Sequence, residues 1–239
     1  MSATTEVRER PILFSGAMVR ALLDGTKTHT RRVVRLPNGP SHADTCEPDL
    51  RKSPDGSLRC VFEFDGEPNA FGVRCPFGDV GDQLWVREAF WFDVRDPNGV
   101  AVYAADDAKH FTARLDTRQI IQDCDEECSN AYFAAHRFWK RKPSIFMPRW
   151  ASRLRLEIVD VRVERLSDIS RVDARAEGIS EYGHEFRDEP WFPGDDEYRN
   201  ATSVENFRRL WDARNAKRGF GWDANPWLWV LAFRRLGVS

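Results

Sequence analysis

The sequence predicts an α+β fold: a small, partly open β-barrel of about six strands with three short helices beside it. Two observations carry this prediction. The chain contains about six short segments with the pattern of strands and only three short segments with helical spacing. The strands are also not separated by crossover helices, which argues against a parallel sheet. We therefore expect a single domain over residues 1–239, with insertions at about 37–58, 106–135 and 182–202.

The first half of the chain predicts one helix followed by short strands. Ser15 can cap a helix over residues 15–24, and Gly25 is a residue type that ends one. Residues 27–34 are expected to be extended, and residues 37–58, rich in Pro, Ser, Asp and Gly, to form a long loop. Further strands are expected at residues 59–64, 71–74, 83–92 and 100–105.

The second half predicts one long strand, two helices and a final strand. Residues 154–166 alternate apolar with charged residues and change phase near Val159 and Asp160, which predicts a bulge. Asp168 can cap a helix that ends near Glu177 and Gly178. A second helix is expected at 203–215, with Val204, Phe207, Leu210 and Trp211 on one stripe, and a last strand at 227–236.

Charge and composition favour an anionic partner. The net charge is only -2, but 30 of the 36 basic residues are Arg, which suits flat, bidentate contact with carboxylate or phosphate. Residues 8–35 hold seven basic residues against two acids, and residues 137–155 hold seven and none. The nine Trp residues include rings that can stack on bases, although aromatic residues are more often core. The alternative is ordinary solvated surface balanced by salt bridges.

The sequence argues against a membrane protein, a secreted protein and a zinc-binding protein. The longest apolar run, residues 227–233, is far shorter than the roughly 18 residues of a membrane helix, so we expect no membrane partner. The polar start has no signal-peptide core, and five irregularly spaced cysteines suit a reducing cytoplasm. Cys124 and Cys128, with His110 and His136 nearby, do not have the paired spacing of a zinc site. We expect neither a metal nor a cofactor.

One segment carries a family resemblance. Residues 25–32 read Gly-Thr-Lys-Thr-His-Thr-Arg-Arg directly after the first predicted helix. They resemble the ASCH superfamily signature, Gly-x-Lys-x-x-Glu-x-Arg, which implies a PUA-like β-barrel and an association with RNA and modified nucleosides. Segments 11–16, 81–88, 147–152, 168–179 and 227–233 resemble a longer branch common in phages and prophages, whose members are often uncharacterised or loosely labelled morphogenetic.

The signature differs from the general one at Thr30, where the superfamily has Glu. The same Thr occurs in the similar bacterial amidohydrolases that remove acetyl from N(4)-acetylcytidine. This resemblance implies that Lys27, Thr30 and Glu177 are catalytic. Thr30 would be the nucleophile, Lys27 in an apolar pocket its base, and Glu177 the acid for the leaving amine.

Five further residues are candidates for binding a nucleic acid or the substrate: Arg31, Arg32, Arg87, Trp85 and Trp227. Three other interpretations stay open. Lys27 and Thr30 can be strand-surface residues, and Arg31 and Arg32 can pair with Asp82 or Glu88. The protein can be a non-catalytic RNA- or DNA-binding module. It can also be a phage interaction or assembly protein that uses the barrel as a scaffold.

Overall fold

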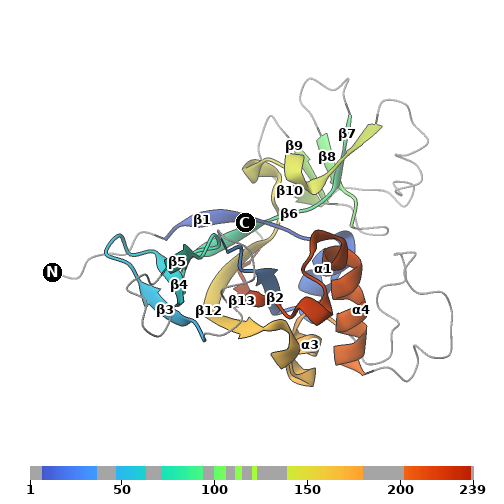
Figure 1. The fold of residues 1–239 in the computed structure, drawn as a ribbon. Helices are drawn as coiled ribbons and strands as arrows, with labels where there is room; N and C mark the ends of the chain where they lie inside the picture. The colour runs from blue at the N-terminus through green and yellow to red at the C-terminus, as the bar shows by residue number, and fades with distance from the viewer. Residues whose placement is uncertain are drawn as a thin grey trace. The chain divides into compact units, whose positions relative to one another are not determined.

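A computed structural model describes residues 7–36, 47–62, 71–93, 100–105, 111–114, 120–122, 139–179 and 202–237. These residues form many strands in sheets and few helices, which confirms the mixed α+β class (Figure 1). The strands make two five-stranded sheets and one three-stranded sheet, and no closed barrel is detected among them. No helix of the described ranges is long and apolar enough to cross a membrane.

The helices and strands have the following bounds. The strands are β1 (Glu9–Leu13), β2 (His29–Val33), β3 (Asp49–Lys52), β4 (Leu58–Phe62), β5 (Phe71–Arg74), β6 (Gln83–Arg87), β7 (Phe90–Asp93), β8 (Val100–Tyr103), β9 (Phe111–Arg114), β10 (Ile120–Gln122), β11 (Trp139–Lys142), β12 (Arg155–Arg165) and β13 (Trp227–Arg235). The α-helices are α1 (Gly16–Leu23), α3 (Arg171–Ala176) and α4 (Ser203–Asn215). Short 3-10 turns are η2 (Ser144–Phe146), η3 (Arg149–Ala151), η4 (Leu166–Asp168), η6 (Ala216–Arg218) and η7 (Trp222–Ala224).

The chain divides into two compact units. The first unit comprises Met1–Arg8, Thr26–Asp82 and Ile158–Arg234. The second unit comprises Glu9–Gly25, Gln83–Glu157 and Arg235–Ser239. Strand β12 contributes residues to both units, and the single domain expected from the sequence stays a prediction.

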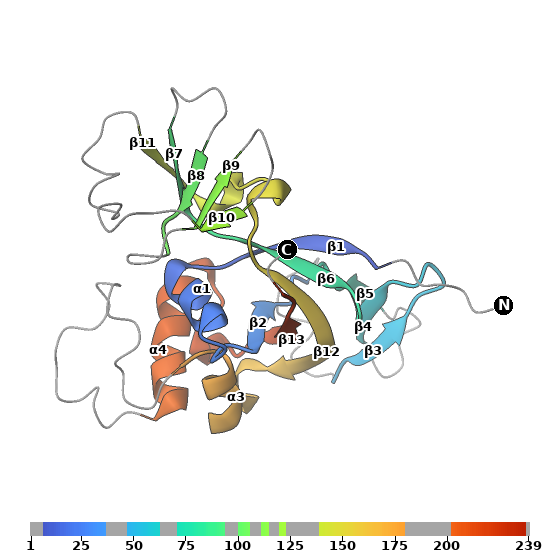
Figure 2. The same cartoon turned by 180° about the vertical axis from the view of Figure 1, so that it is seen from behind.

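The first unit holds the later half of β12 beside β13 and β2. Strands β13 and β2 are antiparallel, and their register opposes Leu231 to Thr30 and Trp229 to Arg32. Helix α3 packs against both α4 and β2, as the view from behind shows (Figure 2). Strands β3, β4 and β5 form the antiparallel three-stranded sheet. Buried side chains of this unit include Phe62, Ile158, Leu210, Trp211, Trp229 and Leu231.

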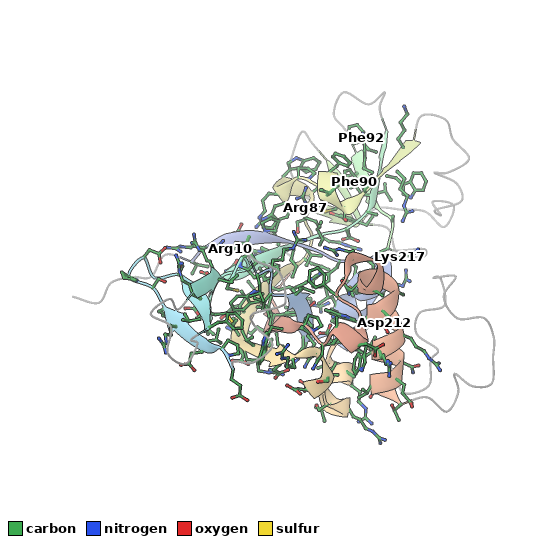
Figure 3. All side chains as sticks on the ribbon, in the orientation of Figure 1. Arg10, Arg87, Phe90, Phe92, Asp212 and Lys217 are labelled. Atoms are coloured by element: carbon green, nitrogen blue, oxygen red, sulfur yellow. The ribbon has the colours of Figure 1, made fainter. Side chains whose placement is uncertain are left out.

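The second unit contains a parallel pair that the sequence did not predict, β1 beside β6. The early half of β12 pairs with β6 antiparallel. The other sheet has the order β10-β9-β8-β7-β11, so β11 lies at its edge beside β7. Phe90 and Phe92 of β7 are labelled in Figure 3, and Phe90 packs with Tyr103 and Met147 in a buried cluster.

The three predicted helices correspond to α1, α3 and α4. Helix α3 begins later than the sequence predicts. Asp168 ends η4, and α3 begins after Ser170, whose hydroxyl accepts a hydrogen bond from the Asp173 amide. The change of phase in the long strand is confirmed, because Val159 and Asp160 are consecutive and both exposed.

Three strands lie where the sequence predicts a loop or an insertion, and two others were not predicted. Strand β3 falls within the expected loop 37–58, and β9 and β10 fall within 106–135. Strand β3 has one apolar residue, Leu50, so alternation cannot reveal it, and pairing with β4 decides its conformation. Strands β1 and β11 were not predicted. Residues 180–201, most of the expected insertion at 182–202, lie outside the described residues.

Candidate functional site

The candidate site in the first unit is centred on Lys27 and Glu177, which are 150 residues apart in sequence. The two residues form an isolated antiparallel β-bridge, and the Thr28 amide donates to the Ala176 carbonyl at 2.8 Å. Both side chains are buried, and Lys27 Nζ donates to Glu177 Oε2 at 2.7 Å. The backbone pairing therefore brings a lysine and a carboxylate into direct contact away from water.

A glycine with positive φ lies close in sequence to each member of this pair. Gly25 follows α1 with a φ of 77°, and Lys27 comes two residues later. Gly178 follows Glu177, the C-cap of α3, with a φ of 87°. The Gly178 and Ile179 amides donate to the carbonyls of Arg175 and Ala174, a Schellman termination. Each glycine adopts a conformation that side chains with a Cβ rarely take, so both turns are encoded locally.

The three hydrogen-bond acceptors around Lys27 Nζ suit an ammonium ion. This Nζ donates to the His29 carbonyl at 2.8 Å and the Glu177 carbonyl at 2.9 Å, in addition to the carboxylate. Three acceptors match the three N–H groups of an ammonium, whereas a neutral amine has only two. Burial lowers the pKa of Lys27, and the charge and hydrogen bond of Glu177 oppose that shift. The contact is thus buried, and desolvation of the lysine is opposed there by the attraction of the Glu177 carboxylate.

Arg31 extends the pair into a network of charges. Its guanidinium lies 3.5 Å from Glu177 Oε1 and donates to Glu164 Oε2 at 3.0 Å. It is also 3.5 Å from Asp173 Oδ1, and Arg162 donates to the same carboxylate at 2.8 Å. Burial raises the pKa of Asp173, but the Ser170 hydrogen bond and the two guanidinium charges outweigh it, so that pKa lies below its usual range.

Thr30 and Arg32 lie on the strand positions that alternate with Arg31. Thr30 is buried, and the hydrogen bonds of the Lys27 network do not include its hydroxyl. Alternation along β2 puts Thr30 and Arg32 on the opposite face from Arg31. Burial lowers the pKa of Arg32 to about 10, the Glu177 charge opposes that shift, and the Arg214 charge adds to it. The structure therefore joins Lys27, Glu177 and Arg31, but not the hydroxyl of Thr30.

The other three predicted binding residues lie elsewhere. Trp227 is in the first unit, with the Arg165 guanidinium 4.2 Å from its ring centroid and Phe62 in an edge contact at 6.3 Å. Trp85 and Arg87 are in β6 of the second unit, where the Arg87 guanidinium lies 5.3 Å from the Trp85 centroid. Neither Trp85 nor Arg87 belongs to the Lys27 network.

The alternative pairing of Arg31 with Asp82 or Glu88 is wrong. Arg31 pairs instead with the three carboxylates of its network. Glu88 is buried in the second unit and forms a bidentate pair with Arg153, both contacts at 2.9 Å. Glu177 is also not an ordinary solvated residue, since its side chain is 4% exposed.

Sequence reasoning missed His29, Glu164 and Asp173. His29 is half-buried, and burial lowers the pKa of its ring, which contacts the Thr28 hydroxyl through Nδ1 at 2.9 Å. Extended alternation puts position 29 on the same face as positions 27 and 31, a signal that could have identified it. Nothing in the local sequence marks Glu164 or Asp173, because their role depends on where β12 and α3 lie relative to β2.

The described residues contain no group of three or more His, Cys, Asp or Glu side chains arranged to hold a metal ion. Cys124, Cys128, His110 and His136 lie outside the described residues. Comparisons of the chain with known protein families, curated proteins and solved structures find no match. The relationship to the ASCH superfamily therefore stays a prediction carried by the motif residues.

Proposed function

We propose that the protein is an amidohydrolase that removes an acyl group from an N-acylated cytidine or a related nucleoside. The observation that supports this most directly is the 2.7 Å contact between the buried side chains of Lys27 and Glu177. These are two of the three residues implicated by the motif, and they come from distant parts of the chain. A desolvated lysine with a lowered pKa beside a carboxylate is typical of sites that move protons.

The chemistry begins with a proton shift inside the pair. Transfer from the Lys27 ammonium to the Glu177 carboxylate gives a neutral amine and a carboxylic acid, which a desolvated site favours more than water does. The amine then takes the proton of the Thr30 hydroxyl as its oxygen attacks the acyl carbon. The carbon–nitrogen bond breaks, and Glu177 gives its proton to the leaving amine. Water hydrolyses the acyl-threonine ester and releases the acid.

This mechanism requires the Thr30 hydroxyl to reach Lys27 Nζ when substrate is bound. Regular alternation along β2 opposes that approach, so the substrate must be accompanied by a local change near residues 27–30. The PUA-like barrel, the nucleoside class of ligand and a cytoplasmic location are parts of the same proposal, and they rest on the motif and composition. A crystal structure with a bound acylated nucleoside tests whether the Thr30 hydroxyl approaches Lys27 Nζ. It also tests whether the strands close into a barrel.

A second candidate, a non-catalytic nucleoside-binding or nucleic-acid-binding module, is favoured by the saturated bonding of Lys27. All three of its donors have acceptors, which is the arrangement of a structural ammonium. In that case the network fixes β2 against α3, and binding is performed by neighbouring groups.

One assay separates the two candidates: incubation with N(4)-acetylcytidine and related acylated nucleosides, followed by chromatography. The hydrolase should release free acid and the deacylated nucleoside. Thr30→Ala should abolish release, Thr30→Ser should restore part of it, and Glu177→Gln should slow turnover while ligand still binds. Circular dichroism of each variant controls for folding. Unchanged substrate across the panel with well-folded parent protein would favour the binding module.

A further inference from the structure

We propose that a surface formed by Lys140, Arg141, Lys142, Ile145 and Phe146 binds single-stranded nucleic acid. Lys140 and Lys142 would contact phosphates from one face of β11, Arg141 would add positive charge from the other face, and Phe146 would stack on a base. We call it the β11–η2 surface. It lies wholly within the second unit, and it does not depend on the hydrolase activity proposed for the first.

The described basic residues of the run 137–155 include some that form ion pairs with acids and others that are exposed. Arg153 is buried against Glu88, and Arg149 donates to both oxygens of Glu9 at 2.7 and 2.9 Å. Lys140, Arg141 and Lys142 are all exposed on β11. Within the described part of the chain, no acid forms an ion pair with any of these three. Three like charges in succession favour an anionic partner.

Apolar side chains are exposed immediately after these charges. Ile145 is 58% exposed and Phe146 65%, and both lie in the short turn η2. The turn is fixed at both ends, since the Phe146 amide donates to the Pro143 carbonyl at 2.9 Å and the Arg87 side chain donates to the Ile145 carbonyl. Arg87, which is labelled in Figure 3, also lies over the Trp85 ring. The ring of Phe146 is therefore held on an anchored turn.

The need to prevent unwanted pairing at a sheet edge does not explain why exposed charges and exposed apolar side chains occur together here. Strand β11 is an edge strand, and charged side chains on an edge discourage unwanted pairing. That role explains Lys140, Arg141 and Lys142. It does not explain the neighbouring Ile145 and Phe146, because exposed apolar side chains promote association.

Nucleic acid fits the surface better than an anionic membrane. Lys140 and Lys142 are two residues apart on a strand, so their side chains project from one face about 7 Å apart, in a row that can follow a phosphate backbone. Membrane binding needs a broad apolar face beside the charges, whereas this surface offers one aromatic ring and one aliphatic side chain. A flat ring beside basic groups is the pattern with which proteins hold unpaired bases.

The test is binding of fluorescently labelled oligouridylate and oligodeoxythymidylate of about 12 nucleotides, a length within the usual site sizes. Anisotropy is measured at roughly 50 and 200 mM salt. The triple variant Lys140→Gln/Arg141→Gln/Lys142→Gln should bind at least tenfold more weakly. The slope of log Kd against log salt should become shallower by about 1.4, since the two phosphate contacts of Lys140 and Lys142 each contribute about 0.7 on a single strand. Phe146→Ala should weaken binding about tenfold without changing that slope.

Two control variants carry matched substitutions, three charges to Gln and one apolar side chain to Ala, at exposed residues of the first unit. Arg171→Gln/Lys217→Gln/Arg218→Gln removes three exposed charges, with Lys217 visible on η6 in Figure 3. Val172→Ala trims a side chain that is 73% exposed. Both controls should bind as the parent does. Equal losses in the control triple would show a general charge effect and overturn the proposal.

Three further outcomes are decisive. The proposal is wrong if the parent binds neither oligonucleotide. It is also wrong if the parent binds vesicles of phosphatidylcholine and phosphatidylserine, but no oligonucleotide, through the same three basic residues. Binding of either RNA or DNA that the triple variant loses supports it, and the stronger of the two identifies the sugar. Release of acid from free N(4)-acetylcytidine is measured in parallel. Oligonucleotide binding by a parent protein that leaves the whole panel of acylated nucleosides unchanged would reject the hydrolase and keep the β11–η2 surface.

Discussion

At the scale of residues, the contact between Lys27 and Glu177 is the feature on which most else depends. A buried ion pair adds little net stability, because desolvation offsets the attraction between the charges. Loss of one partner is costly, since the other charge stays buried. Removal of Lys27 would leave Glu177 with the more distant Arg31 guanidinium, 3.5 Å away.

We predict that Lys27→Met lowers the free energy of unfolding by about 3 kcal/mol. The double variant Lys27→Met/Glu177→Gln should lose clearly less than the sum of the two single variants, because the second change removes the unpaired charge. Urea denaturation of the four proteins measures this cycle. Arg51→Gln, which breaks the exposed 3.0 Å pair with Asp49, is the control and should cost less than about 1 kcal/mol. Additive single effects would contradict an energetically coupled pair.

At the scale of elements, the site depends on how α3 ends. Glu177 is the last residue before Gly178, and the two Schellman hydrogen bonds fix the direction in which the chain leaves the helix. Ala174 and Ile179 are both buried, and positions of this kind contact each other in a Schellman motif. The orientation of Glu177 toward Lys27 is thus set by one turn.

We predict that Gly178→Ala lowers the free energy of unfolding by about 1–2 kcal/mol, since the φ of 87° is strained for a residue with a Cβ. Gly178→Asn should cost less, because Asn adopts this conformation more readily. Gly56, with a φ of 72° and open space where a Cβ would lie, is the matched control in the turn before β4. Thermal melts compare the stabilities. Gly178→Ala, but not Gly56→Ala, should also reduce any acid release.

At the scale of the whole molecule, stability should fall in acid through several groups at once. Burial lowers the pKa of His29 below its ordinary value of 6.5, so the unfolded chain takes up a proton there before the folded protein does. Asp173 and Glu9 also have lowered pKa values in the fold, against burial that acts in the other direction. Each of these groups contributes stability at neutral pH that is lost as the pH falls.

We predict that the melting temperature declines as the pH drops below about 6.5, first through His29 and then, near pH 4, through the carboxylates. His29→Gln should remove the upper part of this decline and leave the lower part. Melting curves across this pH range for the parent and His29→Gln measure the two parts. A parent protein equally stable at pH 5 and pH 7 would contradict the assignment of His29 as a group kept neutral by burial.

Local patterns in the sequence determined the α+β class, the three helices and the change of phase in β12, whereas Lys27, Thr30 and Glu177 became candidates only through the family resemblance. The class, the helices and the change of phase each follow from signals that span a few residues. Gly25 ends α1 and Gly178 ends α3, each with positive φ. The capping box of Thr202 and Glu205 opens α4. Helix termination, capping and alternation depend mainly on neighbours in the chain, so they are readable without coordinates.

Only the tertiary structure decided the rest. It paired β1 with β6 in parallel, made a strand of the polar segment β3, surrounded Arg31 with Glu164, Asp173 and Glu177, and kept the Thr30 hydroxyl out of that network. It also separated the paired arginines of the run 137–155 from the exposed charges of the β11–η2 surface. The physical reason is that strand pairing and charge burial are long-range: each depends on which distant segment supplies the partner, and no local pattern encodes that choice.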